Sequence, residues 1–200
     1  MNKFPRSAYV HIPFCHRRCF YCDFAVIPLG NKVETLKGYG SKTVQEYLQF
    51  LYKEILSIKH KSSLSTIYIG GGTPSILDPK QIKELIDLFK ENYGIDFGAE
   101  ITMEVDPASF NQDDLYGFIN AGINRFSLGV QSFNNQILQN SGRRHLREDA
   151  EKSCLWLKRE YDSGLIKSWS LDLIQNLPLS GFNRWQDDFC LLYTSPSPRD

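Results

Sequence analysis

The segment Ser7–Cys22 reads SAYVHIPFCHRRCFYC and joins a strand-like run to three closely spaced cysteines. Its first half alternates polar and apolar residues, as a half-buried strand does. Cys15, Cys19 and Cys22 follow with the spacing C-x3-C-x2-C. Iron–sulfur clusters are held by thiolates at such spacings, and three protein ligands leave one iron of a four-iron cluster open. The segment therefore predicts a strand that leads directly into a metal site.

A structural zinc ion is the main alternative for the same cysteines. His11 or His16 could supply a fourth ligand. Structural zinc sites usually take two ligands from each of two separated knuckles, however, and the sequence has no second knuckle. We therefore favour the cluster over zinc. The sequence assigns no role to Arg17 and Arg18, which lie inside the loop.

Strand-like and helical patterns alternate along the rest of the chain. Strands are expected at Ser7–Pro13, Thr66–Gly70, Glu100–Val105, Arg125–Gln131 and Ser168–Ile174. Helices are expected at Thr43–Lys59, Pro79–Asn92, Asn111–Asn120, Asn134–Asn140 and Leu146–Tyr161, with the start of another near Gly181–Phe189. Crossovers of this length imply a parallel sheet, either doubly wound or curled towards a barrel.

Two of the expected helices carry capping signals at their starts. Thr43-x-x-Glu46 has the pattern of a capping box. Asp78 followed by Pro79 has the pattern of an N-cap with a first-turn proline.

Alternation within the strands helps to choose between the two parallel folds. A parallel strand that is covered on both faces is almost continuously apolar. Glu100–Val105 instead alternates polar and apolar residues, and three other strands do the same. A single polar residue could simply satisfy a loop backbone. A pattern shared by four strands indicates a polar cavity at their carboxyl ends, where the active sites of barrels lie.

The glycine-rich stretch Gly70–Pro74 (GGGTP) follows the second expected strand. Its glycines let the backbone approach a ligand closely and expose its amides and carbonyls. It lacks the Gly-Lys-Ser/Thr of a P-loop, and it is not the dinucleotide fingerprint. Beside a three-cysteine loop it predicts a cofactor cradle.

Composition limits the classes of partner. The 23 basic and 23 acidic residues give a formal net charge of zero, so no overall charge points to nucleic acid or an anionic membrane. No apolar run approaches the ~20 residues of a transmembrane segment, and the first residues lack the apolar core of a secretion signal. We expect a cytoplasmic protein, in which clustered cysteines are metal ligands rather than disulfides.

These motifs together resemble the radical S-adenosylmethionine (radical SAM) superfamily. Within it they resemble the HemN/HemW group of oxygen-independent coproporphyrinogen III dehydrogenases and heme chaperones. The resemblance runs in order from about Ser7 to Phe189, and it implies an α/β fold, a partial (β/α)6 TIM-like barrel with about five of six strand–helix units present. Beyond the cysteine and glycine loops, the matching segments are Glu104–Pro107, Gly122–Arg125, Ser127–Phe133, Gly142–Arg143 and Asp172–Pro178.

The resemblance also implies which residues bind cofactors. Cys15, Cys19 and Cys22 would bind a [4Fe-4S] cluster, with S-adenosylmethionine (SAM) on the fourth iron. In such enzymes the reduced cluster gives one electron to SAM, and the resulting 5′-deoxyadenosyl radical abstracts hydrogen from the substrate. Tyr21 could pack on the adenine. The positions that match SAM contacts are Tyr9, Gly71, Gly72, Thr73, Glu104, Gln131, Arg143 and Asp172.

Phe24 bears on which branch of the group the chain resembles. In the dehydrogenases a fourth cysteine stands two residues after the third, where this chain has Phe24. This difference implies a heme chaperone, with heme, a heme-acceptor protein and an electron donor for the cluster as partners. A dehydrogenase acting on a porphyrinogen is the alternative. A radical SAM enzyme with another substrate is a third.

The end of the chain departs from the family pattern. The family continues with a sixth strand and a C-terminal domain, so residues 1–189 would be the N-terminal part of a radical SAM core, with an unpaired sheet edge. Cys190–Asp200 resembles a translated sequencing-library adapter and is expected to be non-native. Cys154, on an amphipathic helical stretch, is expected to be a buried structural thiol.

Overall fold

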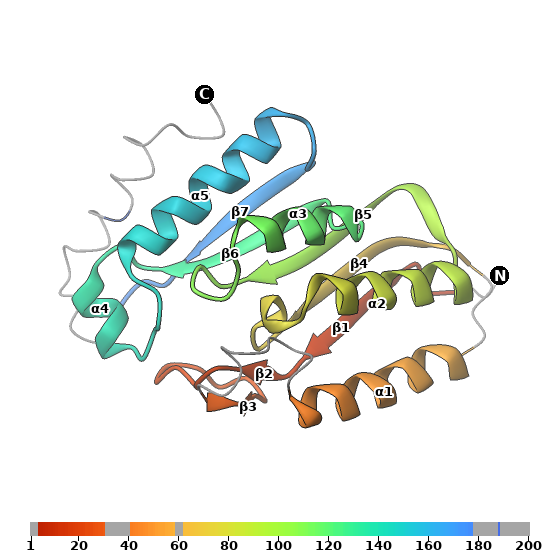
Figure 1. The fold of residues 1–200 in the computed structure, drawn as a ribbon, viewed down its shortest axis with the longest axis horizontal. Coiled ribbons are helices and arrows are strands. Elements are labelled where there is room, and N and C mark those ends of the chain that lie inside the picture. Colours follow the sequence, from red (N-terminus) through yellow and green to blue (C-terminus); the bar gives the residue numbers. More distant parts are fainter. Residues whose placement is uncertain (1–3, 31–40, 59–61, 178–187, 189–200) are drawn as a thin grey trace.

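The computed structural model describes residues 4–30, 41–58, 62–177 and 188 of the 200-residue chain. A curved parallel sheet alternates with helices along the chain (Figure 1). The strands of this sheet are β1 (Ser7–Ile12), β4 (Leu64–Gly71), β5 (Ile95–Val105), β6 (Arg125–Gln131) and β7 (Ser168–Leu173). The helices are α1 (Lys42–Ser57), α2 (Pro79–Asn92), α3 (Gln112–Asn120), α4 (Asn135–Asn140) and α5 (Arg147–Asp162), with a 3-10 turn, η3, at Pro74–Ile76.

The strands stand in the sheet in the same order as in the chain, β1-β4-β5-β6-β7, and every neighbouring pair is parallel. Each crossover therefore moves one strand further in the same direction, as in a barrel of alternating strands and helices. A doubly wound sheet would instead reverse direction beside its first strand. The strand order confirms the predicted α/β fold and its partial barrel.

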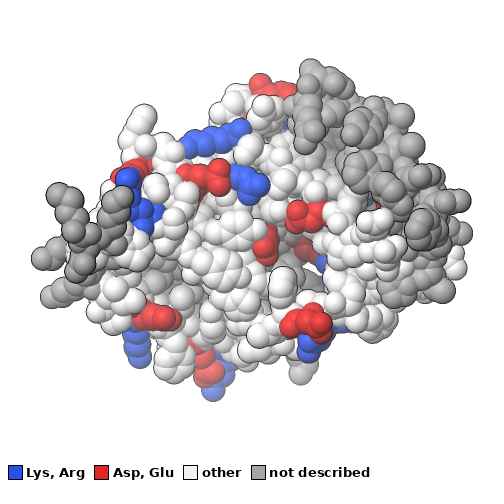
Figure 2. Space-filling model, turned by 180° about the vertical axis from the view of Figure 1, so that it is seen from behind, with Lys and Arg blue, Asp and Glu red and all other residues white. Residues whose placement is uncertain are grey.

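The two faces of the sheet differ as the alternation predicts. Ile69, Met103 and Phe126 are fully buried and belong to the main hydrophobic core. Successive side chains of a strand point to opposite faces, so Glu104 and Ser127 lie on the other, polar face. Figure 2 shows the molecule from behind, with acidic side chains around a hollow near the centre of the view. Acidic and basic side chains are otherwise mixed on this surface.

The helix starts confirm one capping prediction and correct the other. Asp78 caps α2: its side chain accepts a hydrogen bond from the Lys80 amide at 2.8 Å, and Gln81 completes a capping box. The capping box predicted from Thr43 is wrong. Ser41 is the N-cap of α1 and accepts from the Val44 amide at 3.4 Å. Both residues have suitable hydroxyls, and the backbone turns into the helix at the earlier one.

The structure adds a short ladder that the sequence did not predict. β2 (Phe14–Cys15) pairs with β3 (Ile27–Pro28), which closes the cysteine loop at its base. Strands of two residues are too short to carry a periodic pattern. β5 also begins at Ile95, earlier than the expected Glu100.

Some predictions fall outside the described residues. The helix expected near Gly181–Phe189 does so except for Asp188, whose carboxylate accepts hydrogen bonds from Ser132 Oγ at 2.9 Å and the Phe133 amide at 2.7 Å. The tail Cys190–Asp200 lies outside them entirely. Among the described helices, none is long and apolar enough to cross a membrane.

Candidate functional site

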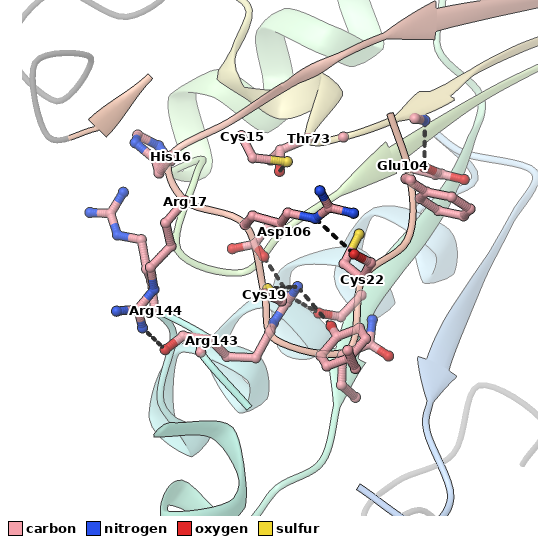
Figure 3. Close-up of a pocket in the computed structure, with 18 of the residues that line it drawn as sticks. Cys15, His16, Arg17, Cys19, Cys22, Thr73, Glu104, Asp106, Arg143 and Arg144 are labelled. Carbon is pink, nitrogen blue, oxygen red and sulfur yellow. Dashed lines mark hydrogen bonds and ion pairs between the residues drawn. The ribbon is translucent and has the colours of Figure 1, made fainter. Parts of the chain in front are cut away.

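A cavity of about 480 Å³ lies where the cysteine loop meets the carboxyl ends of the strands. Figure 3 shows side chains from the cysteine loop, the glycine loop and the strand ends around it. Most of the predicted site residues line this cavity: Cys15, Cys19, Tyr21, Cys22, Gly71, Gly72, Thr73, Glu104, Gln131, Arg143 and Asp172. The topology therefore brings together residues that stand up to 157 positions apart (15 to 172) in the sequence.

Tyr9 is the predicted residue that does not line the cavity. Its side chain lies on β1 and is 61% exposed. The hydroxyl lies 3.1 Å from His11 Nδ1, and the ring stacks on Tyr68 with 6.0 Å between centroids. Tyr68 in turn donates a hydrogen bond to Glu104, which does line the cavity. Tyr9 is thus connected to the site through one intervening side chain.

The cysteine loop is fixed to the rest of the molecule by backbone and arginine contacts. The Phe20 amide donates to the Ser141 carbonyl at 3.0 Å. Arg18 Nε donates to the Cys22 carbonyl at 2.9 Å, and Arg17 donates to the Arg143 carbonyl. The two loop arginines, which the sequence left without a role, hold the loop in its conformation.

Two of the three cysteine sulfurs accept hydrogen bonds from residues across the cavity. Thr73 Oγ1 lies 3.5 Å from Cys15 Sγ, and Arg143 Nη1 lies 3.9 Å from Cys19 Sγ. The three thiols are free and half-buried. Burial raises the pKa of Cys15, and the hydrogen bond from Thr73 works against that increase. Polar donors on sulfur are typical of protein-bound iron–sulfur clusters.

The three thiols do not converge on one point. Among the described residues, no group of three His, Cys, Asp or Glu side chains is placed to hold a single metal ion. Structural zinc requires four ligands around one ion, and His11 is already hydrogen-bonded to Tyr9 and to the Ala25 carbonyl. In a four-iron cluster each thiolate binds a different iron, so no such convergence is needed.

The glycine loop brings β4 against the cysteine loop. A Cβ added at Gly72 would lie 2.5 Å from the Phe14 carbonyl oxygen and 2.9 Å from Cys15 Sγ. The Gly72 amide donates to the Ile12 carbonyl and the Thr73 amide to the Phe14 carbonyl. The expectation that this loop exposes its amides is therefore wrong for these two residues. Their amides instead join the glycine loop to Ile12 of β1 and to Phe14 of β2.

Glu104 is held at the end of β5 by two donors. Its carboxylate accepts from the Gly71 amide at 3.0 Å and from the Tyr68 hydroxyl at 2.7 Å. Burial raises the pKa of Tyr68, and the bond to Glu104 raises it further. Tyr68 therefore stays a neutral donor and Glu104 has a fixed orientation towards the cavity.

Arg143 is the most connected side chain of the cavity. Its Nη2 lies 2.5 Å from an Asp106 carboxylate oxygen and 2.5 Å from the Gly129 carbonyl, and its Nη1 lies 3.5 Å from the Tyr21 hydroxyl. Burial alone would lower the pKa of Arg143, but Asp106, Tyr21 and Cys19 raise it overall. The site prediction missed Asp106. In the sequence, the only indication of a role for Asp106 was that it lies in Glu104–Pro107, one of the segments that resemble the family.

The ends of β6 and β7 also contribute side chains to the lining of the cavity. Ser127 Oγ donates to the Asp172 carboxylate, with oxygens at 3.0 and 3.2 Å. Gln131 has a positive φ of 68°, a conformation that costs a non-glycine residue free energy and is concentrated at functional sites. Phe24 also lines the cavity and is 62% exposed. An exposed apolar side chain thus forms part of the cavity lining, beside the polar groups at the strand ends.

Comparison with known proteins agrees with this geometry. Residues 9–168 match the Radical SAM superfamily. The chain is 40% identical to the heme chaperone HemW of Synechocystis sp. over 94% of this chain and 44% of that protein. It is 36% identical to the oxygen-independent coproporphyrinogen III oxidase of Salmonella typhimurium, over 87% of this chain and 36% of that protein.

A solved structure gives the same assignment. The coproporphyrinogen III oxidase HemN of Escherichia coli, described as a radical SAM enzyme, aligns with a TM-score of 0.77 and 30% identity. The alignment covers 93% of this chain and 41% of that one. The chain spans less than half the length of these relatives. It belongs to the radical SAM superfamily, in the HemW/HemN group.

Proposed function

We propose that this chain is the cofactor-binding part of a heme chaperone, which binds heme and transfers it to an acceptor protein. The observation that carries the proposal is Phe24, which occupies the position two residues after Cys22 where the dehydrogenase pattern has a fourth cysteine. The 40% identity to a protein named heme chaperone HemW supports the same function. The mixed surface charge and equal numbers of acidic and basic residues favour a small-molecule ligand over nucleic acid.

In this proposal Cys15, Cys19 and Cys22 would hold three irons of a [4Fe-4S] cluster, and the fourth iron would be open to the amine and carboxylate of SAM. When bound, the cluster and SAM supply one-electron chemistry at a sulfonium carbon–sulfur bond. The donor set fits the cluster, because three free thiols line one cavity and two of their sulfurs accept hydrogen bonds.

The other residues of the cavity would bind and orient SAM. Glu104 and Asp172 are carboxylates that can accept from ammonium and hydroxyl groups, and Arg143 can pair with a carboxylate. Glu104 is fixed by Tyr68 and the Gly71 amide, and Asp172 by Ser127. Both acceptors are therefore held before any ligand binds.

A coproporphyrinogen III dehydrogenase is the second candidate. It is supported by the 36% identity to the Salmonella typhimurium oxidase and by the structural likeness to HemN. This chain spans less than half of both relatives. A radical SAM enzyme with another substrate is a third candidate.

The experiment that separates these functions uses anaerobically reconstituted protein. Addition of heme should produce a Soret band. Incubation with SAM, a reductant and coproporphyrinogen III should leave the porphyrinogen carboxyl groups intact. A decarboxylated product formed together with 5′-deoxyadenosine would refute the chaperone proposal and establish the dehydrogenase. Absence of both heme binding and porphyrinogen turnover would favour a different substrate.

A further inference from the structure

Asp106 has no part in the cofactor contacts proposed above, yet it is bonded to the central arginine of the cavity. One carboxylate oxygen lies 2.5 Å from Arg143 Nη2, and the other accepts from the Ala108 amide at 3.0 Å. The Arg143 and Asp106 side chains are only 11% and 20% exposed. This is a partly buried ion pair, and such pairs depend strongly on both partners being present.

The same guanidinium reaches a proposed cluster ligand. Arg143 Nη1 lies 3.9 Å from Cys19 Sγ, while Nη2 contacts Asp106 and the Gly129 carbonyl. Figure 3 shows Asp106, Arg143 and Cys19 close together on one side of the cavity. One nitrogen of the guanidinium is therefore anchored to the protein, and the other is directed at sulfur.

We propose that Asp106 is a positioning residue that holds the Arg143 guanidinium against Cys19 and thereby raises the reduction potential of the cluster. The inference rests on the proposed function, since it requires the cluster. A cation and a hydrogen bond at a ligand sulfur favour the reduced, more negative state of an iron–sulfur cluster. Asp106 acts through Arg143 and does not contact sulfur itself.

The sign of the potential shift separates positioning from a simple charge effect. Without the Asp106 charge, a guanidinium that is only 11% exposed is left uncompensated, so it should turn towards water. Cys19 then loses its nearest cation and the potential falls. If Arg143 instead stays in place without its counter-ion, the local field becomes more positive and the potential rises.

Asp106→Asn is the appropriate variant, because the asparagine oxygen can still accept from the Ala108 amide. Asp113→Asn is the matched control, since Asp113 lies in the first turn of α3 and is not one of the residues that line the cavity. The midpoint potential of the reconstituted whole chain is measured by redox titration with electron paramagnetic resonance. For Asp106→Asn we expect the ratio of reduced to oxidised cluster at a fixed potential to be about tenfold lower. This corresponds to a decrease of about 59 mV in the midpoint potential of a one-electron couple. Asp113→Asn should leave the potential unchanged.

The same substitution is then repeated in an Arg143→Gln background, where it should no longer lower the potential. Arg143→Lys provides a second test, because a lysine keeps the charge but cannot span both Asp106 and Cys19; it too should lower the potential. A raised or unchanged potential in Asp106→Asn, or an equal decrease with and without Arg143, would overturn the inference. A wild-type chain that takes up no cluster would overturn the proposed function as well, and that outcome is distinct from a cluster whose potential is insensitive to Asp106.

Discussion

At Gly72 the absence of a side chain allows the glycine loop to touch the cysteine loop. An added methyl group would lie 2.5 Å from the Phe14 carbonyl oxygen and 2.9 Å from Cys15 Sγ. The backbone oxygen cannot move aside as a flexible side chain can. We expect Gly72→Ala to lower the free energy of unfolding by about 1–3 kcal/mol, as overpacking does, and to reduce iron uptake. Chemical denaturation and iron analysis measure the two effects.

Gly164→Ala is the control for this substitution. Gly164 has a φ of +74°, and a methyl group added there would meet no described atom within 4 Å. The cost there should be about 1–2 kcal/mol from backbone conformation alone, with iron uptake unchanged. If Gly72→Ala bound iron as the wild type does, close contact between the two loops would not be required.

The cysteines provide a second prediction at the level of residues. Cys19→Ala should abolish the brown cluster absorbance after reconstitution, because three thiolates are needed and this one also accepts from Arg143. Cys154→Ala should leave it intact. Burial, with Glu151 nearby, raises the pKa of Cys154 to about 12, so this thiol stays protonated and is a poor ligand. Visible absorption spectra of the two reconstituted variants measure the cluster absorbance. An equal loss of this absorbance in Cys19→Ala and Cys154→Ala would contradict the ligand assignment.

At the level of elements, the two helix caps differ in strength. Asp78 accepts from the Lys80 amide at 2.8 Å within a capping box, whereas Ser41 accepts at the longer distance of 3.4 Å. We expect Asp78→Ala to destabilise the protein by about 1 kcal/mol, and Ser41→Ala to have a smaller effect. Urea denaturation of the two variants compares them directly. A larger loss for Ser41→Ala would show that bond length does not rank these caps.

The elements themselves were largely predictable from periodicity. Four strands of the main sheet lie within two residues of their predicted bounds, whereas β5 begins at Ile95, five residues before the predicted start. The alternation in Glu100–Val105 correctly indicated a polar inner face. The ladder between β2 and β3 was not predictable, because two-residue strands carry no pattern. The cap of α1 was misassigned because Ser41 and Thr43 are chemically alike at this position.

The candidate site was predictable to the extent that its residues lie in motifs. The cysteine and glycine loops are local in sequence, and both line the cavity. The contact between Asp106 and Arg143 joins residues from distant segments, so no spacing could reveal it. The role of Arg17 was missed for the same reason, because its acceptor is the Arg143 carbonyl. The acceptor of Arg18 is the nearby Cys22 carbonyl, and a bond to a backbone carbonyl carries no signal in residue types.

At the level of the whole molecule, the sequential strand order explains why one cavity can collect all these groups. Parallel strands that follow one another around a barrel place all of their carboxyl ends at one rim. Gly71, Glu104 and Asp172 come from three different strands, yet all line the same cavity. The site therefore depends on the fold as a unit, and global unfolding should remove it.

A buried histidine beside the cavity should make that global stability depend on pH. His145 is 1% exposed, its Nε2 donates to the Val130 carbonyl at 3.0 Å, and its Nδ1 has no hydrogen-bond partner among the described residues. Burial lowers the pKa of His145 below 6.5, and Asp106 opposes this decrease. The unfolded chain therefore binds this proton more readily than the folded one.

The stabilisation that comes from a neutral His145 is fully present above about pH 6.5. The free energy of unfolding then falls as the pH decreases, by at most about 1.4 kcal/mol per pH unit for one proton. His145→Gln should reduce the loss of unfolding free energy between pH 7 and pH 5, measured by denaturation at both values. Equal losses in the variant and the wild type would mean that His145 does not contribute to the pH dependence.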